Sequence, residues 1–158
     1  MKNISVLVTG GAGFIGANLV RMMIDVGYKV SVLDNFSTGS YTYLEGLSVD
    51  IVEGDVLDRD LLAKVIRSHH SIVHLAAQTG VPGSLIDPYK DCETNVVGTL
   101  NVLEACRAAK ESSDTKVSQK IVFASSNAPL GRQIPPASED KAPLPVSPYG
   151  ASKLAAEA

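Results

Sequence analysis

Glycines are concentrated near the start of the chain, in the stretch from Thr9 to Gly16. A short apolar run, Ile4 to Val8, precedes it and apolar residues at helical spacing follow, so we expect a strand, a glycine loop and a helix. Glycines let backbone N–H groups approach a pyrophosphate, which the positive end of a helix dipole also favours. The spacing fits Gly11, Gly13 and Gly16, or Gly10, Gly13 and Gly16 with a wider first gap. Alone, the pattern fits an ordinary glycine-rich loop equally well.

An acidic residue follows the loop at the distance that a dinucleotide site requires. Lys29 to Leu33 is expected to form a second strand, closed by Asp34 and Asn35. By itself an Asp-Asn pair indicates a turn. Asp34 comes roughly twenty residues after the loop, however, where a carboxylate accepts hydrogen bonds from the adenosine ribose. Because a carboxylate there repels a 2′-phosphate, we expect NAD rather than NADP.

A tyrosine and a lysine lie one helical turn apart near the end of the chain. Ser147 is expected to cap a helix whose first residue is Pro148, where a missing N–H is harmless. Tyr149 and Lys153 then lie on the same face of that helix. Without other motifs, an ordinary exposed helix pair would be the better interpretation.

The elements that would position these residues alternate along the chain. We expect strands at residues 4–8, 29–33, 49–53, 71–75 and 120–124, and helices after the glycine loop, from the Asp58 cap to about Arg67, and at 89–110. Residues 81–88 and the polar segment 111–118 are expected to be loops, and the proline-rich segment 129–145 a surface excursion. This order predicts an α/β fold with a doubly wound parallel sheet of the Rossmann type.

Composition narrows the classes of function. At 158 residues with 45% hydrophobic content we expect one domain, residues 1–158. A net charge of -3 provides no basic surface for nucleic acid, and we expect no membrane span and a cytoplasmic location.

Cys92 and Cys106 are expected to be buried free thiols. No spacing of histidines, cysteines and acids indicates a metal site.

Seven motifs occur in the order found in one known superfamily. They are Thr9-Gly-Gly-Ala-Gly-Phe-Ile-Gly16, Asp34, Gly54-Asp-Val56, His74-Leu-Ala-Ala-Gln78, Asn95 before Val96-Val-Gly-Thr99, Ser125-Ser126, and Ser147-Pro-Tyr-Gly-Ala-Ser-Lys153. From Ile4 to Ala158 the chain resembles the extended short-chain dehydrogenase/reductases. More narrowly, it resembles the NAD-dependent nucleotide-sugar epimerase/dehydratase family typified by UDP-glucose 4-epimerase.

The resemblance implies roles for particular residues. Tyr149 would be the acid/base that takes a proton from a sugar hydroxyl, with the Lys153 ammonium favouring its phenolate and holding the nicotinamide ribose. Ser126 would hydrogen-bond the reacting oxygen. The cofactor-binding residues would be Gly10, Gly13, Phe14, Ile15, Gly16, Asp34, Asn35, Asp55, Val56, Leu75, Ala76, Ala77, Asn95, Tyr149 and Lys153.

The chain also departs from the family pattern. Family members that dehydrate sugars usually carry Thr-Asp-Glu where this chain has Ser126-Asn-Ala128, so dehydratase activity is disfavoured. The family continues for about as many residues again, adding the last strands of the sheet and a domain that binds the nucleotide sugar. We therefore expect residues 1–158 to be the amino-terminal fragment of a longer protein, with the carboxyl-terminal strands and the substrate domain missing.

Three hypotheses about function remain open. The first is the NAD-binding portion of an epimerase that transiently oxidises a sugar hydroxyl and returns hydride to the opposite face. The second is a non-catalytic NAD-binding module, since the 158-residue chain alone is expected to be inactive. The third is a nucleotide-sugar dehydrogenase or reductase of the same family. A homodimer through the helices that follow the fourth and fifth strands is also expected.

Overall fold

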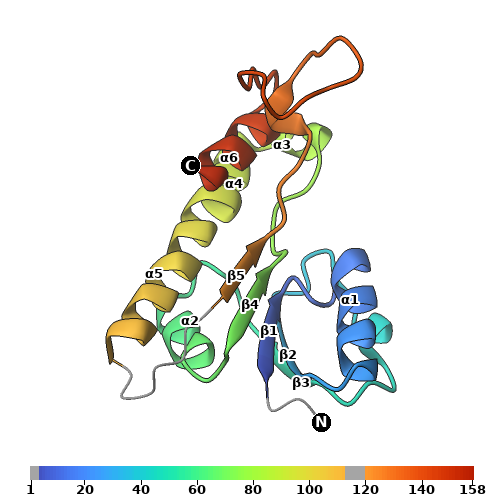
Figure 1. Ribbon diagram of the computed structural model, residues 1–158, viewed down its shortest axis with the longest axis vertical. Helices are drawn as coiled ribbons and strands as arrows, with labels where there is room; N and C mark the ends of the chain where they lie inside the picture. The colour runs from blue at the N-terminus through green and yellow to red at the C-terminus, as the bar shows by residue number, and fades with distance from the viewer. Residues whose placement is uncertain (1–3, 113–119) are drawn as a thin grey trace. The chain divides into compact units, whose positions relative to one another are not determined.

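A computed structural model describes residues 4–112 and 120–158 (Figure 1). The chain forms two compact units, residues 1–76 with 101–124 and residues 77–100 with 125–158.

The sequence predicted a connecting loop at residues 111–118. Glu111 and Ser112 instead complete a helix, and the remaining residues of that segment lie outside the described part of the chain. None of the helices within the described ranges combines the length and apolar character that a bilayer-spanning segment needs.

The first unit is built around a parallel sheet. Its strands are β1 (Ser5–Thr9), β2 (Lys29–Asp34), β3 (Asp50–Glu53), β4 (Ser71–His74) and β5 (Lys120–Phe123). They pair in the order β3-β2-β1-β4-β5 (Figure 1), and every pair is parallel. This order confirms the predicted doubly wound sheet, whose direction of winding reverses between β1 and β4.

Alternate residues of β1 face two separate apolar clusters. Val6 and Val8 pack with Ala17 and Val20 of helix α1 (Phe14–Asp25) on one face. Leu7 belongs to the other cluster, which also contains side chains from α2 (Arg59–Ile66) and α5 (Gly98–Ser112): Leu62, Ile66, Val102, Ala105 and Cys106. Helices therefore cover both faces of the sheet, which explains why its strands are apolar rather than alternating.

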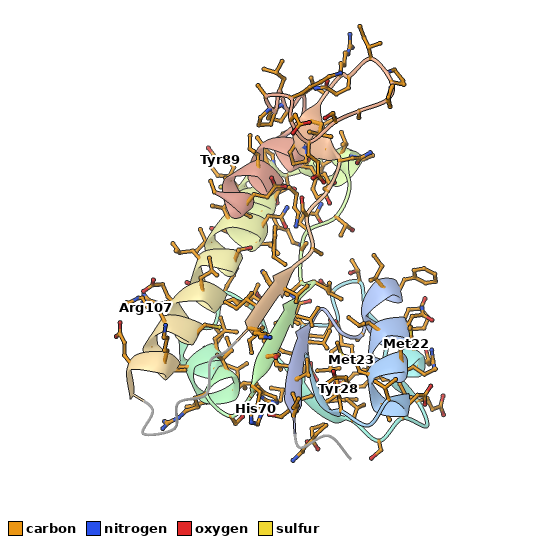
Figure 2. The ribbon with its side chains drawn as sticks, in the orientation of Figure 1. Met22, Met23, Tyr28, His70, Tyr89 and Arg107 are labelled. Atoms are coloured by element: carbon orange, nitrogen blue, oxygen red, sulfur yellow. The ribbon has the colours of Figure 1, made fainter. Side chains whose placement is uncertain are left out.

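The labelled side chains of Figure 2 show how α1 is oriented. Met23 and Tyr28 pack against the cluster that contains Val6, whereas Met22 is 67% exposed. The helix ends at Asp25, and Gly27, two residues later, has φ +90°, a conformation that glycine adopts readily after a helix. The predicted cap of α2 is confirmed, since Asp58 Oδ1 accepts a hydrogen bond from the Leu61 N–H at 2.9 Å.

The second unit contains helices and irregular chain. These are α3 (Val81–Ile86), α4 (Pro88–Cys92), a π-helical stretch (Glu93–Val97), the 3-10 turn η3 (Ala128–Leu130) and α6 (Pro148–Glu157). The predicted start of α6 is confirmed, because Ser147 Oγ accepts a hydrogen bond from the Gly150 N–H at 3.1 Å. Residues 131–147 contain only turns, bends and irregular chain, as the prolines predict.

Two expectations are corrected in this unit. Residues 81–88 were expected to be a loop, but 81–86 form α3, because Pro82 occupies the first turn where no N–H is needed. Cys92 was expected to be buried but is exposed. The side chains that α4 and the π-helical stretch bury are instead the polar Asp91 and Asn95.

Candidate functional site

The glycine loop in the first unit is fastened to the sheet through its backbone. The Gly10 N–H donates to the Leu33 carbonyl at 2.8 Å, and the Gly13 N–H donates to the Gly10 carbonyl at 3.2 Å. Gly10 has φ +69°, and a Cβ there would stand 2.7 Å from the Ala76 nitrogen. Any other residue at Gly10 would meet both backbone strain and a backbone clash.

The loop leads directly into the N-terminus of α1. A Cβ on Gly16 would overlap the Gly10 carbonyl oxygen, so the helix lies as close to the loop as glycine allows. Gly13 is the N-cap residue and offers no side chain to the first turn, and Phe14 and Ile15 are exposed. The first-turn N–H groups and the positive helix end therefore face outward without a side-chain cap.

Asp34 ties the end of β2 to this loop. Its Oδ2 accepts a hydrogen bond from the Ala12 N–H at 2.8 Å, and its Oδ1 accepts one from the Phe36 N–H at 2.9 Å. Asp34 is buried. A carboxylate has about four lone-pair positions, so roughly two remain for hydroxyl donors.

A second carboxylate lies at the end of β3. Asp55 Oδ2 accepts a hydrogen bond from Asn35 Nδ2 at 2.7 Å, and its Oδ1 accepts one from the Leu57 N–H at 2.9 Å. Val56 is buried, and its carbonyl accepts a hydrogen bond from Asn101 Nδ2 at 3.1 Å. Asn35, Asp55 and Val56 are thus held in one place beyond the carboxyl ends of β2 and β3.

Thr9 and His74 organise the carboxyl end of β4, and the sequence analysis gave Thr9 no separate role. Thr9 Oγ1 accepts a hydrogen bond from the Ala76 N–H at 3.2 Å and is 2.7 Å from His74 Nδ1. The Leu75 N–H donates to the Thr9 carbonyl at 3.0 Å. These contacts hold the backbone of Leu75 and Ala76 next to Gly10, where a Cβ would clash with it.

The second unit contains the tyrosine and the lysine. Tyr149 is half-buried and Lys153 is 4% exposed. Burial lowers the pKa of Lys153, while the nearby carboxylates of Glu157 and Asp91 oppose that shift. Gly150 fixes this end of α6, because a Cβ there would stand 2.7 Å from the Ala128 carbonyl oxygen of η3.

Ser126 stands at the entry to η3, in the same unit as Tyr149. Its Oγ accepts a hydrogen bond from the Ala128 N–H at 3.1 Å, and Ser126 is half-buried. The neighbouring Ser125 donates to Glu157 of α6. Since η3 and α6 pack together, Ser126 and Tyr149 belong to one local arrangement.

A buried polar network, with Asn95 at its centre, supports this arrangement. Asn95 Oδ1 accepts a hydrogen bond from the Gln78 N–H at 2.8 Å, and its Nδ2 donates to the Gln78 carbonyl, Asp91 Oδ1 and Ser152 Oγ at 3.1, 3.2 and 3.0 Å. Ser152 Oγ in turn donates to the Tyr149 carbonyl at 3.1 Å. The sequence motifs predicted no role for Asp91 or Ser152. The spacing of Asp91 and Asn95, four residues apart on one helical face, was the available signal.

The candidate residues thus fall into two groups. Those of the first unit are Gly10, Gly13, Phe14, Ile15, Gly16, Asp34, Asn35, Asp55, Val56, Leu75 and Ala76. Those of the second are Ala77, Asn95, Ser126, Tyr149 and Lys153. Within residues 4–112 and 120–158, histidines, cysteines and acids form no group of three that could hold a metal ion.

A model of the GDP-mannose 4,6 dehydratase family matches residues 7–158. The chain therefore belongs to this family, and its resemblance to nucleotide-sugar epimerases and dehydratases is confirmed.

Known relatives include more than one activity. The chain is 36% identical over 155 residues to a UDP-glucose 4-epimerase of Azospirillum brasilense, covering 96% of this chain and 42% of the relative. It is 35% identical over 148 residues to a UDP-N-acetyl-alpha-D-glucosaminuronate decarboxylase of Bacillus cytotoxicus, covering 92% and 42%. The solved UDP-glucose 4-epimerase of Brucella ovis in complex with NAD superposes with a TM-score of 0.87 at 38% identity, covering 98% and 46%. The chain thus spans a little less than half the length of these relatives.

Proposed function

We propose that the chain binds NAD and forms the cofactor-binding part of a nucleotide-sugar epimerase. The observation that carries the proposal is the Asp34 carboxylate, which is buried and held by the N–H groups of Ala12 and Phe36 beside the glycine loop. Such a carboxylate accepts hydrogen bonds from ribose hydroxyls and repels a 2′-phosphate. NAD is therefore preferred over NADP.

The loop residues fit a dinucleotide. At Gly10 and Gly16 a Cβ would meet backbone atoms, so the chain keeps its backbone close to the space where a pyrophosphate would lie. Gly13 leaves the first turn of α1 without a side-chain cap, so its N–H groups are available to an anion. The complex of the Brucella ovis epimerase with NAD supports this assignment.

The second unit would supply the proton-transfer groups. NAD, when bound, supplies a hydride acceptor for a sugar carbon. Tyr149 would take the proton of the sugar hydroxyl and return it, and the Lys153 ammonium one turn along α6 would favour the phenolate form. Ser126 would donate a hydrogen bond to the reacting oxygen.

Epimerisation is proposed rather than dehydration, although the family model takes its name from a dehydratase. Ser126, Asn127 and Ala128 offer neither the acid nor the base that water elimination needs. Relatives named as UDP-glucose 4-epimerases support this choice. In the protein that contains this chain, Tyr149→Phe should abolish interconversion of a UDP-sugar, because the phenol that moves the proton is lost.

Isothermal titration of the 158-residue chain with NAD and NADP tests the cofactor assignment. We expect NAD to bind and Asp34→Asn to weaken it by about 10- to 100-fold, since hydrogen bonds to a charged group are lost. Glu45→Gln, which removes an exposed carboxylate, should leave the affinity unchanged. Equal affinity of the wild type and Asp34→Asn for NAD, with circular dichroism showing both folded, would contradict the assignment.

A second candidate is that these 158 residues bind NAD without turning over a substrate. The observation behind it is that the chain matches only 42–46% of the length of its relatives. Incubation of the chain with NAD and UDP-glucose decides between the candidates. Formation of UDP-galactose would exclude the binding-only function, and net production of NADH would instead favour a dehydrogenase.

We also propose that the protein forms a homodimer in the cytoplasm. Val97 and Leu100 lie three residues apart and are 43 and 54% exposed, so they offer apolar surface for pairing with a second copy. Light scattering after size-exclusion chromatography should give twice the mass of one chain. Leu100→Lys should return the monomer mass, and the exposed Lys110→Glu should not.

A further inference from the structure

Asp91 is a buried carboxylate that the proposed function has not used. It lies in α4 and is 1% exposed. Its Oδ1 accepts the hydrogen bond from Asn95 Nδ2 at 3.2 Å, whereas Oδ2 has no hydrogen-bond partner among the described residues. A buried carboxylate needs a compensating charge, because its desolvation otherwise costs several kcal/mol.

Lys153 is the buried cation of the same unit. It lies on α6, and the elements packed against α6 are α3, α4, η3 and the π-helical stretch. Neither α3 nor η3 contains an ionisable side chain, and Tyr89, Lys90, Cys92 and Glu93 are exposed. On α6 itself, Glu157 is exposed and Tyr149 is half-buried. Asp91 is therefore the one buried acid in the described part of this unit.

A chain of hydrogen bonds joins the two elements. Asp91 accepts from Asn95, and Asn95 donates at 3.0 Å to Ser152, the residue directly before Lys153. Ser152 donates to the Tyr149 carbonyl one turn earlier. The backbone on which Tyr149 and Lys153 stand is thus connected to Asp91 through buried groups.

We propose that Asp91 is the counter-ion of Lys153 and a positioning residue for the Tyr149–Lys153 pair. The pairing places two opposite charges in one buried region, where each offsets the desolvation of the other. It also explains why a carboxylate is buried in a helix that otherwise exposes Tyr89, Lys90 and Cys92.

Electrostatics agree with this geometry. Burial lowers the pKa of Lys153, and the carboxylates of Glu157 and Asp91 both act against that shift. Loss of the Asp91 charge would therefore lower the pKa of Lys153 further. The Glu157 carboxylate is exposed, so water and salt screen its charge more than that of the buried Asp91.

The consequence for catalysis rests on the proposed function. Lys153 favours the Tyr149 phenolate only while its amine is protonated. Asp91 would keep it protonated in a buried site, and so extend the alkaline limb of the pH–rate profile.

The test is an NMR titration of the 158-residue chain without cofactor. The ¹³Cε resonance of Lys153, assigned with Lys153→Arg, reports the protonation of its amine. We expect Asp91→Asn to lower the Lys153 pKa and so to raise the neutral fraction of its amine several-fold at a given pH. Glu93→Gln removes an exposed carboxylate two residues after Asp91 in the sequence. It should leave the Lys153 pKa unchanged. The same Lys153 pKa in the wild type and in folded Asp91→Asn would overturn the proposal.

A measurement on the wild type decides the matter if Asp91→Asn does not fold. The Asp91 ¹³Cγ resonance should then move as the Lys153 amine, followed through its ¹³Cε resonance, loses its proton. If the Asp91 resonance stays constant through that step, the two groups are not coupled and the proposal fails. Both readouts are independent of NAD, so failure of the cofactor assignment would appear separately, as absent heat in the NAD titration.

Discussion

The two units hold their candidate residues by different means. In the first, backbone hydrogen bonds and two apolar clusters fix the glycine loop, and Asp34 is its main side-chain anchor. In the second, a buried network of Gln78, Asp91, Asn95 and Ser152 fixes the helix that carries Tyr149 and Lys153. The difference shows that the first unit should respond mainly to losses of apolar volume, and the second to losses of single polar groups.

The largest effect is expected from Leu7→Ala in the first unit. Leu7 is fully buried at the centre of β1, so truncation removes apolar contacts and leaves a cavity. We expect a loss of about 2 to 5 kcal/mol in the free energy of unfolding, measured by urea denaturation. Leu7→Met should cost less than about 1.5 kcal/mol. Equal losses for the two variants would contradict volume-based packing.

Asn95→Leu probes the second unit at similar side-chain volume. It leaves the half-buried Gln78 N–H and the buried Asp91 Oδ1 without these partners, and a buried group that loses its partner costs about 1 to 3 kcal/mol of unfolding free energy. Hydrogen exchange followed by mass spectrometry should show faster exchange in residues 77–100 and 147–158 than in the β1–β2 region. Asn127→Leu, at an exposed position of the same unit, is the matched control. Uniformly faster exchange in both units would remove the distinction between them.

His69 gives the first unit a modest dependence on pH. Its Nδ1 donates to the Val65 carbonyl at 2.8 Å, its Nε2 is 2.9 Å from Ser31 Oγ, and burial lowers its pKa. The unfolded chain therefore takes up a proton at higher pH than the folded chain does. The stability that His69 contributes is present above about pH 6.5 and is lost as pH falls below it. His69→Gln should flatten the pH dependence of urea unfolding in this range, and an unchanged slope would refute this.

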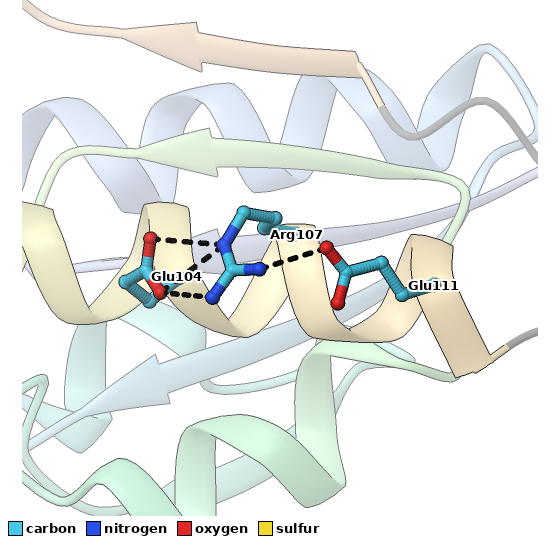
Figure 3. Close-up of polar contacts among 3 residues, drawn as sticks. All are labelled: Glu104, Arg107 and Glu111. Atoms are coloured by element: carbon cyan, nitrogen blue, oxygen red, sulfur yellow. Dashed lines mark hydrogen bonds and ion pairs between the residues drawn. The ribbon is translucent and has the colours of Figure 1, made fainter.

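The smallest effect is expected at the surface of α5. Arg107 bridges Glu104 and Glu111 at 2.7 Å each (Figure 3), and these contacts raise the pKa of Arg107 and lower that of Glu104. All three side chains are well exposed, so water and salt screen the pairs. Arg107→Ala should leave the melting temperature unchanged within error. A clear drop would mean that surface charge helps to hold the first unit together.

Local rules predicted the first unit well. The parallel doubly wound sheet follows from the alternation of strands and helices, and the capping role of Asp58 follows from its side chain. Asp34 was found because its distance from the glycine loop is characteristic, and its hydrogen bond with the Ala12 N–H joins the two motifs.

Local rules served the second unit less well. Prolines and a glycine indicated a loop at 81–88, yet Pro82 is harmless in the first turn of α3. Free cysteines are usually buried, so Cys92 was expected to be buried, whereas this part of the chain buries Asp91 and Asn95 and exposes Cys92. The partner that makes this favourable, Ser152, is 57 residues away from Asn95, and no local pattern reveals such a contact.

Cofactor binding at the glycine loop can be followed directly in the amide NMR spectrum of the chain during titration with NAD. We expect NAD to shift the N–H resonances of Ala12, Gly13 and Gly16, and NADP at the same concentration to shift them much less. A spectrum that NAD leaves unchanged at these residues would contradict NAD binding at the loop.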